Sequence, residues 1–253
     1  MEYNHLFVIV VHFQIGYIIY MELQKEKIYT TSEIMDYLLK TNPNQKSSSL
    51  YNQIKKMEEK GKIARISKSK YVFKNFMLFS YDLTKPAKKV LRLLKSNYTF
   101  DFCIYETQEV LNQFLNHLLS TNAIIVEVPK MYMNHVFYTL RDNGFNNVLY
   151  NPNKEEVFRY LSDNTIVIAP LSSKAPIIRE EHRITIEKLA VDIIVSPLLN
   201  CFYEGGEIEN IISDITHHYL VKYDTLRTYA KRRYAYDKLI EYVSDLAKEF
   251  LND

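Results

Sequence analysis

Apolar residues recur at helical spacing soon after position 30. A Thr-Thr-Ser run at 30–32 can supply an N-cap, and apolar side chains follow at positions 34, 37 and 38. The pattern ends near Lys40, and Pro43 biases the residue before it away from helical dihedral angles. We therefore expect a short helix at 33–40, followed by a turn.

A second, longer helical pattern follows this turn. The serines at 47–49 offer a cap, and the helix is expected to continue to Lys60, where Gly61 suits its C-terminus. Three apolar residues at spacings of four and three share one face, namely Leu50, Ile54 and Met57. The opposite side is polar, which is typical of an amphipathic helix that packs against a small module.

Two strand-like runs come next, at 62–66 and 70–73, and the turn Ser67-Lys68-Ser69 joins them. Helix, turn, helix and a basic two-stranded hairpin is the element order of a winged helix-turn-helix. The second helix of such a module enters the major groove of DNA. We therefore expect a winged-helix domain at 22–75 and a linker at 76–89, with Pro86 near the start of the next helix.

The remainder of the chain alternates between strand-like and helical runs. Strands are expected at 100–105, 123–128, 147–150 and 165–169. Helices are expected at 107–119, 130–141 and 154–161, and then at 185–199, 207–219, 223–233 and 235–250. The pattern predicts an α+β protein in which residues 90–253 form an α/β sheet domain with C-terminal helices.

The first 21 residues form an apolar leader. Its 16-residue run at 6–21 is shorter than the about 20 residues of a membrane-spanning helix, and no Lys or Arg precedes it as in a signal peptide. Three interpretations remain, namely a weak membrane anchor, an apolar arm packed on the protein or a partner subunit, and a start-site artefact. We favour a start at Met21, because the residues after it are typical of a soluble N-terminus. A membrane partner is not expected.

Charge is distributed unevenly along the chain. The net charge is +2, from 32 Lys and Arg against 30 Asp and Glu. Residues 21–75 hold 12 basic and 6 acidic side chains, whereas residues 76–253 hold 20 and 23. A basic module on a mildly acidic body indicates an anionic partner for the module, such as nucleic acid.

Composition restricts the chemistry of the chain. Five glycines form neither GxGxxG nor GxxxxGK[ST], so a phosphate-binding loop is not expected. Cys103 and Cys201 lie 98 positions apart, which suits neither a zinc motif nor a disulfide framework and favours a reducing cytoplasm. No cofactor, metal or small-molecule ligand is expected.

The candidate DNA-binding residues lie on the second helix and the hairpin. Base contacts are expected from the polar face of the helix, from Ser48, Tyr51, Asn52 and Lys55. Phosphate contacts are expected from Lys56, Lys62, Arg65, Lys68 and Lys70. Two alternatives remain open, which are a solvated basic face and a winged helix that contacts protein.

A charged group in the body lies on one predicted helix. Lys188 and Asp192 are four positions apart and share a helical face. Glu187 lies roughly 140° around the helix from Asp192, so the two carboxylates do not form a metal pair. A structural ion pair between Lys188 and Asp192 is the favoured interpretation.

Two further basic features complete the candidate body site. The cluster Arg227, Lys231, Arg232 and Arg233 can bind phosphate, an acidic partner or a helix end. Lys174 follows Ser172-Ser173 and suggests a Ser–Lys arrangement, but the prolines at 170 and 176 favour a turn there.

Several strings of the chain resemble a known family. SLYNQI at 49–54 and KGKIARI at 60–66 resemble the winged helix of AbiEi-type antitoxins from bacterial abortive-infection systems. Body strings resemble a related group of bacterial proteins, namely IIVEV at 124–128, PLSSKAP at 170–176, IEKLAVD at 186–192 and LRTYAKRR at 226–233. The resemblance covers residues 22–235.

This resemblance implies a winged helix joined to a degenerate nucleotidyltransferase-like domain. Such antitoxins bind operator repeats, repress their own operon and oppose a nucleotidyltransferase toxin that a neighbouring gene encodes. By match, Tyr51, Asn52, Lys55, Arg65 and Lys68 would face DNA. The signature positions of the body would be Glu187, Lys188, Asp192 and 227–233.

The chain departs from the family pattern at two places. The turn 67–69 lacks the glycine often found in the wing, and Gly205-Gly206 is followed by Glu207 and Glu209 rather than by a strand-borne carboxylate pair. The sequence therefore predicts a DNA-binding, autorepressing regulator without an intact catalytic motif. The alternatives are a divergent nucleotidyltransferase that uses Glu187 and Asp192, and an interaction scaffold that binds through 227–233.

Overall fold

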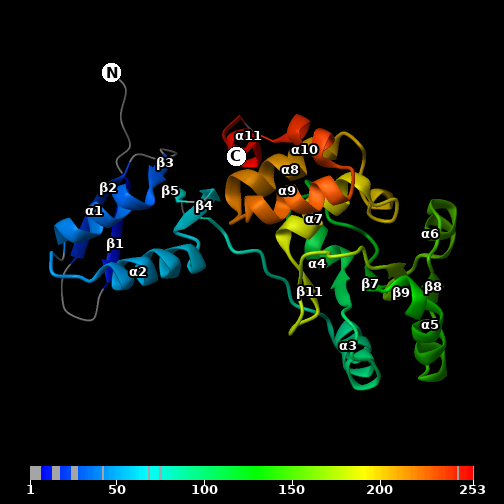
Figure 1. The fold of residues 1–253 in the computed structure, drawn as a ribbon. Coiled ribbons are helices and arrows are strands. Elements are labelled where there is room, and N and C mark those ends of the chain that lie inside the picture. The colour runs from blue at the N-terminus through cyan, green and yellow to red at the C-terminus, as the bar shows by residue number, and fades with distance from the viewer. Residues whose placement is uncertain are drawn as a thin grey trace. The chain divides into compact units, whose positions relative to one another are not determined.

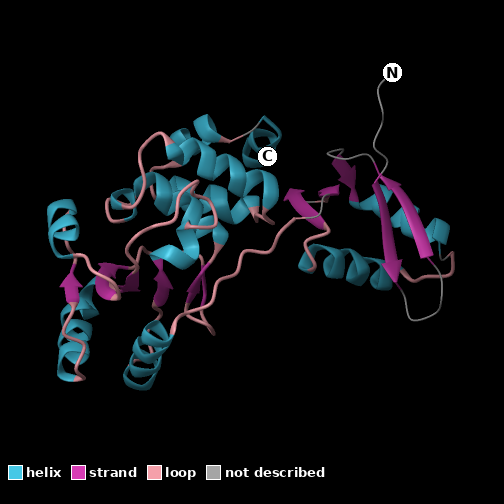
Figure 2. Ribbon diagram, turned by 180° about the vertical axis from the view of Figure 1, so that it is seen from behind, coloured by secondary structure: helices cyan, strands magenta, loops and turns pink. Residues whose placement is uncertain are grey.

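The structure, a computed structural model, describes residues 7–12, 18–23, 28–41, 43–67, 69–73, 76–243 and 245–252. The chain forms two compact units. Unit 1 holds the described residues up to Leu78, together with 218–224 and those from 246 onward, and unit 2 holds 79–217 and 225–245. Both units mix helices with small sheets, and helices end the chain, so the expected α+β class is confirmed (Figures 1 and 2).

Unit 1 contains the two helices that the pattern predicts, α1 (Thr31–Thr41) and α2 (Ser47–Glu59). A capping box precedes α1. The Thr30 amide donates to Glu33 Oε2 at 2.7 Å, and the Glu33 amide donates to Thr30 Oγ1 at 3.2 Å. Thr30 is thus the capping residue among the three candidates at 30–32.

Gly61 ends α2, as its position predicts. The Lys62 amide donates to the Met57 carbonyl and the Gly61 amide to the Glu58 carbonyl, both at 2.9 Å, which is the Schellman pattern. Gly61 has a φ of 68°, and a Cβ there would lie 2.6 Å from the Phe76 carbonyl oxygen. Glycine is therefore required at this position by both backbone conformation and close approach.

A three-stranded antiparallel sheet completes this part of unit 1. Its order is β3-β5-β4, with β3 at Ile28–Thr30, β4 at Ile63–Ser67 and β5 at Lys70–Phe73. Ser69 replaces glycine in the hairpin turn and adopts a φ of 77°. The Ser69 carbonyl accepts the Thr31 amide at 2.8 Å, which attaches the hairpin tip to the start of α1.

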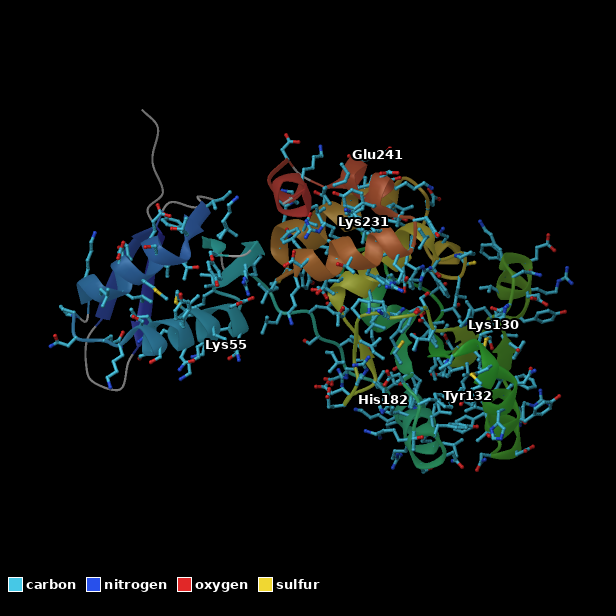
Figure 3. The ribbon with its side chains drawn as sticks, viewed as in Figure 1. Lys55, Lys130, Tyr132, His182, Lys231 and Glu241 are labelled. Atoms are coloured by element: carbon cyan, nitrogen blue, oxygen red, sulfur yellow. The ribbon has the colours of Figure 1, made fainter. Side chains whose placement is uncertain are left out.

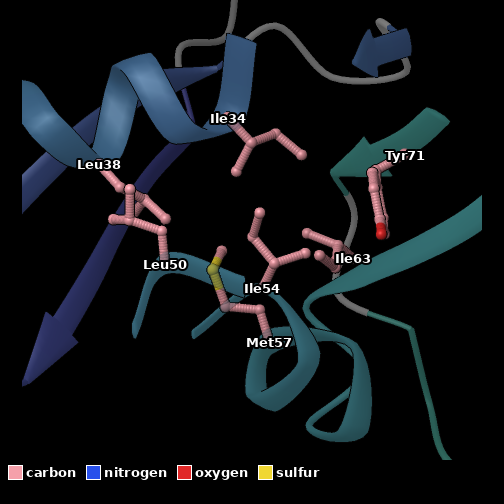
Figure 4. Packing of buried hydrophobic residues seen from close by; sticks show 7 residues of the cluster. All are labelled: Ile34, Leu38, Leu50, Ile54, Met57, Ile63 and Tyr71. Atoms are coloured by element: carbon pink, nitrogen blue, oxygen red, sulfur yellow. The ribbon is translucent and has the colours of Figure 1, made fainter. Parts of the chain in front are cut away.

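One apolar cluster holds α1, α2 and the sheet together (Figure 4). Seven buried side chains form it, namely Ile34, Leu38, Leu50, Ile54, Met57, Ile63 and Tyr71. Leu50, Ile54 and Met57 are the face of α2 that the sequence predicts to be buried. Burying an aliphatic side chain contributes about 1.5–3 kcal/mol, so this face fixes which side of α2 remains outside.

The apolar leader and the two residues after it contain two antiparallel strands, β1 (Phe7–His12) and β2 (Ile18–Leu23), with Phe7 opposite Leu23. The rest of the stretch 1–21 lies outside the described residues. Whether translation starts at Met21 stays a prediction. Among the described residues, no helix has both the length and the apolarity needed to cross a membrane.

The sheet of unit 2 has four strands in the order β6-β7-β9-β8. They span Cys103–Glu106, Ala123–Val128, Thr165–Pro170 and Val148–Tyr150, respectively. β7, β9 and β8 are parallel, whereas β6 is antiparallel to β7. All six residues of β7 are buried, as expected for a strand covered on both faces.

Helices alternate with these strands along the chain and then continue to its end. The first group comprises α3 (Lys85–Asn97), α4 (Thr107–Leu111), α5 (Met133–Asp142) and α6 (Lys154–Tyr160). The later helices are α7 (Ile186–Val195), α8 (Glu207–His218), α9 (Tyr223–Arg232), α10 (Tyr236–Tyr242) and α11 (Asp245–Asn252). Short elements complete the fold, namely η1 (Lys130–Tyr132), η2 (Leu199–Cys201) and the β10–β11 hairpin (Ile177–Ile178, Arg183–Ile184).

Three predicted helices are wrong in extent. The helix expected at 107–119 ends at Leu111, because the Asn112 side chain accepts the Leu119 amide at 2.9 Å and closes a loop instead. The helix expected at 235–250 is broken at Val243, which is buried with an extended ψ of 154°. In both places, local polar bonds or burial outweigh helical periodicity. The helix expected at 185–199 ends at Val195, because Pro197 biases Ser196 away from helical dihedral angles and Ser196 has a ψ of 113°.

The units differ in extent from the expected domains. α3 begins inside the expected linker at 76–89, and unit 2 begins at Phe79. The segments 218–224 and 246–253 group with unit 1, although the sequence pattern places them in the body. Met77 forms an isolated parallel bridge with Tyr219, and its amide donates to the His218 carbonyl at 2.7 Å.

Candidate functional site

The face of α2 opposite the apolar cluster is exposed. It carries five of the candidate residues, namely Ser48, Tyr51, Asn52, Lys55 and Lys56. Tyr51 is 58% exposed although it is aromatic, and Lys55 projects from α2 in Figure 3. An aromatic ring, an amide and two ammonium groups on one solvated helix face are suited to contact a polar, anionic partner.

Lys55 has one partner on its own helix. Its Nζ lies 3.8 Å from Glu59 Oε1, and the two side chains are 74% and 61% exposed. An exposed pair of this kind is worth about 0.3–0.5 kcal/mol, so Lys55 can exchange Glu59 for a phosphate or a base at little cost.

The β4–β5 hairpin carries the remaining candidates. Arg65 and Lys70 are exposed, and Lys62 is half-buried between α2 and β4. Arg65 lies opposite Tyr71, and Ser67 lies opposite Lys70 in the strand register. Lys68 lies outside the described residues. Every described candidate for DNA binding is therefore on α2, on the hairpin or on the link between them.

The charged residues of α7 lie in a different environment. Nine consecutive residues of α7, from Ile186 to Ile194, are buried, including Glu187, Lys188 and Asp192. Lys188 is 1% exposed, and its Nζ donates to Glu127 Oε1 at 2.9 Å and also to Asp192 Oδ2. The predicted pair of Lys188 and Asp192 is present, and β7 supplies a second carboxylate.

Arg233, the residue directly after α9, completes this buried charge cluster. Its Nη1 donates to Asp192 Oδ1 at 2.9 Å and to Ser172 Oγ at 2.5 Å, and lies 3.0 Å from the Tyr229 hydroxyl. The Tyr229 hydroxyl donates to Asp192 Oδ1 at 3.1 Å. The two carboxylates and the two cations balance, which lowers the cost of burying them.

Burial and charge act in opposite directions on the cluster. Burial alone would lower the pKa of Lys188, but the carboxylates of Asp192 and Glu127 together raise that pKa well above its usual value. Burial raises the pKa of the Cys103 thiol and of the Tyr105 hydroxyl, and the Glu127 carboxylate raises both pKa values further. Lys188 is thus held charged, while Cys103 and Tyr105 are held neutral.

Several members of this cluster belong to no site that the sequence predicts. Glu127 receives hydrogen bonds from Lys188, from Tyr105 at 3.0 Å and from Cys103 at 3.8 Å. One signal was available, because Glu127 is the single charged residue in the otherwise apolar run 123–128. Tyr229 lies in an ordinary amphipathic helix, and nothing in its spacing distinguishes it.

The other candidates of the body do not join the cluster. Lys174 is exposed in the left-handed region with a φ of 54°, and Arg232 is exposed at the end of α9. Lys231, labelled in Figure 3, lies 4.7 Å from the centre of the Tyr236 ring. Arg227 is half-buried. The basic cluster at 227–233 is therefore divided, with Arg233 alone turned to Asp192.

A metal site is not evident in this part of the molecule. Within the described residues, no group of three or more His, Cys, Asp and Glu side chains is placed to hold a metal ion. The described cysteines, Cys103 and Cys201, are both free thiols.

A family model matches residues 49–249 of the chain, and its description reads "Family of unknown function (DUF6577)". The match runs from α2 through α11 and covers more than half of the chain. The chain belongs to the DUF6577 family. The buried charge cluster and, apart from Ser48, the candidate residues on the exposed face of α2 lie inside the part of the chain that the DUF6577 match covers.

Other comparisons add little to the DUF6577 assignment. No curated protein matches the chain. Among solved structures, the chain is similar to the RV2827C protein from Mycobacterium tuberculosis, with 11% sequence identity and a TM-score of 0.37. That match covers 89% of this chain and 75% of the mycobacterial protein.

Proposed function

We propose that the chain is a DNA-binding protein that contacts the duplex through α2 and the β4–β5 hairpin. The observation that carries the proposal is the division of α2 into two faces. One face is buried in the cluster with Ile54, and the other presents Tyr51, Asn52 and Lys55 to solvent. The order of α1, α2 and the hairpin supports a winged helix, in which α2 occupies the major groove.

Charge supports the same interface. The segment 21–75 has twice as many basic as acidic residues, and Arg65 and Lys70 are exposed on the hairpin. Cations on the wing would contact phosphates and supply affinity without sequence preference, whereas Asn52 and its neighbours on α2 would read base edges.

The resemblance to AbiEi-type antitoxins makes this proposal more specific. We infer that the protein represses its own operon by binding inverted repeats upstream of it, and that unit 2 is a degenerate nucleotidyltransferase-like body. A nucleotidyltransferase-type toxin would be encoded by a neighbouring gene. Determining which protein the adjacent gene encodes tests the proposed toxin partner separately from DNA binding.

The enzyme alternative has less support. A two-metal nucleotidyltransferase needs carboxylates that are open to cations. The Asp192 carboxylate already accepts hydrogen bonds from Lys188, Tyr229 and Arg233. Occupancy by two cationic side chains of the protein itself disfavours a metal role for Asp192.

An electrophoretic gel shift on the DNA upstream of the gene tests the interface. We expect the double variant Lys55→Ala with Arg65→Ala to bind at least ~10-fold more weakly, because contacts of charged groups are worth about 1.5–3 kcal/mol. The matched control is Lys174→Ala with Arg232→Ala, which removes the same charge from exposed positions of unit 2. Equal binding by the two double variants would rule out the proposed interface.

A further inference from the structure

A cavity of about 430 Å³ lies in unit 2 beside the buried charge cluster. Its lining comes from the carboxyl ends of the parallel strands. Glu127 is near the end of β7, Ala169 and Pro170 end β9, and residues 151–153 follow β8 directly. Ligands of open α/β sheets bind outside the carboxyl ends of the strands, and small-molecule pockets commonly measure about 300–1,000 Å³.

Glu127, Asp192 and Arg233 of the charge cluster line this cavity, and the two carboxylates already accept several hydrogen bonds each. Glu127 accepts from Lys188, Tyr105 and Cys103, and Asp192 accepts from Lys188, Tyr229 and Arg233. The carboxylates are therefore neutralised by the protein's own cations. Neither carboxylate is available as the main partner of a cation in the cavity.

Arg233 has spare donors. Its guanidinium makes three hydrogen bonds, all through Nη1, and within the described part of the chain Nε and Nη2 make no hydrogen bond. The side chain is 23% exposed and lines the cavity. A guanidinium edge with two parallel N–H donors matches the two oxygens of a carboxylate or phosphate.

Asn151 places a second polar group on the cavity wall. Its backbone has a φ of 42°, in the left-handed region, and its amide donates to the Ile168 carbonyl at 2.8 Å. The side-chain amide has no hydrogen bond to any described residue. Asparagine adopts this conformation more readily than most residues, so the backbone here is not an unusual one.

We infer that this cavity binds a small organic anion, held through its carboxylate or phosphate by the Nε–Nη2 edge of Arg233. Asn151 would donate to or accept from the same ligand. The polar groups Ser172 and Ser196 and the apolar surfaces of Pro197 and Leu198 line the space left for the rest of the molecule. This inference does not depend on DNA binding, because every residue that carries it lies in unit 2.

Isothermal titration calorimetry on the full-length protein tests the site. Adenosine monophosphate and inorganic phosphate serve as phosphate probes, and succinate serves as the carboxylate probe. We expect saturable binding of at least one probe. The probe that binds shows whether the site prefers a phosphate or a carboxylate. Arg233→Gln should weaken that binding by ~10-fold or more, because it removes the free guanidinium edge.

The matched control is Arg232→Gln, which removes the same charge from the neighbouring exposed position outside the cavity and should bind as the wild type does. Because Arg233→Gln also disturbs the contact with Asp192, Ala169→Leu provides a second test. It fills the cavity from β9 and leaves every charge in place, and it should abolish binding while circular dichroism stays unchanged. Absence of binding by the folded wild type with all three probes up to ~10 mM overturns the inference, as does undiminished binding by either cavity variant.

Discussion

In unit 1 the described basic side chains of α2 and the hairpin are exposed, whereas in unit 2 the charged side chains of α7 are buried, with Lys188 and Asp192 paired. Lys55 is 74% exposed on its side chain and has a weak partner, while Lys188 is 1% exposed between two carboxylates. The two lysines have the same chemistry and different surroundings. A solvated ammonium group can bind a partner molecule, whereas a buried one is already paired with carboxylates inside the fold.

Because of this difference, removing a cation should have different effects in the two units. Removing an exposed cation leaves no unpaired charge behind, so its effect should appear in binding rather than in folding. Removing a buried cation leaves carboxylates in a low-dielectric interior, and the cost falls on folding.

Replacing the buried lysine should have the largest effect on stability. Lys188→Met leaves Glu127 and Asp192 without their shared cation, and breaking a buried ion pair costs about 3–5 kcal/mol. Urea denaturation followed by circular dichroism measures the free energy of unfolding. Lys174→Met is the matched control, because Lys174 is exposed in the same unit and its loss should change stability by less than ~0.5 kcal/mol. Equal stability of the two variants would show that the charge cluster does not stabilise unit 2.

A change at Gly61 should have a smaller effect that is confined to unit 1. Gly61→Ala imposes a φ of 68° on alanine and brings Cβ to 2.6 Å from the Phe76 carbonyl oxygen, with an expected cost of about 1–3 kcal/mol. Hydrogen exchange should increase in peptides of α2 and the hairpin. Gly205→Ala in unit 2 is the control, because a Cβ there meets no atom within 4 Å. Unchanged exchange in α2 for Gly61→Ala would contradict the close approach.

Alkaline pH should destabilise unit 2 gradually. The pKa values of Cys103 and Tyr105 are raised in the fold above their usual 9.0 and 10.0, mainly by burial. The folded chain therefore retains protons that the unfolded chain loses. Their contribution to stability is complete below pH 9.0 and falls as pH rises above it, by on the order of 1 kcal/mol per pH unit.

Urea titrations between about pH 8 and pH 11 measure this fall. Burial raises the pKa of the Cys201 thiol as well, so the double variant Cys103→Ala with Cys201→Ala removes both thiol ionisations. The decline should then begin near the usual pKa of tyrosine, 10.0. Stability that stays constant over the whole range would contradict the burial of these two groups.

Local patterns predict unit 1 more completely than unit 2. The cap of α1, the glycine that ends α2, the apolar face of α2 and the hairpin all follow from residues within a few positions of one another. The serine cap expected for α2 at 47–49 is wrong, because Lys46 is the N-cap residue and makes no side-chain cap hydrogen bond. Gly61 and the face of Leu50, Ile54 and Met57 are each recognisable in the sequence. Ser69 is an exception, because it adopts a left-handed φ where glycine is the expected residue.

The site in unit 2 depends on contacts between distant positions. Spacing of four residues predicts the pair of Lys188 and Asp192, but Glu127 lies 61 positions from Lys188 and Arg233 lies 41 positions from Asp192. Such contacts follow from the packing of β7, α7 and α9, which periodicity does not specify. For the same reason, no motif predicts the cavity at the strand ends.

The salt dependence of DNA affinity tests most directly whether the exposed basic face of unit 1 is the functional one. Fluorescence anisotropy with a duplex from the upstream region would be measured over a range of salt for the wild type, Lys56→Ala and Arg232→Ala, two exposed single-cation changes. We expect the logarithm of the affinity to fall linearly with the logarithm of the salt concentration in the wild type. This fall should be shallower by ~0.9 in slope for Lys56→Ala, which loses one phosphate contact, and should be unchanged for Arg232→Ala. The same slope for Lys56→Ala as for the wild type, or absence of binding to the duplex at low salt, would contradict DNA binding through α2 and the hairpin.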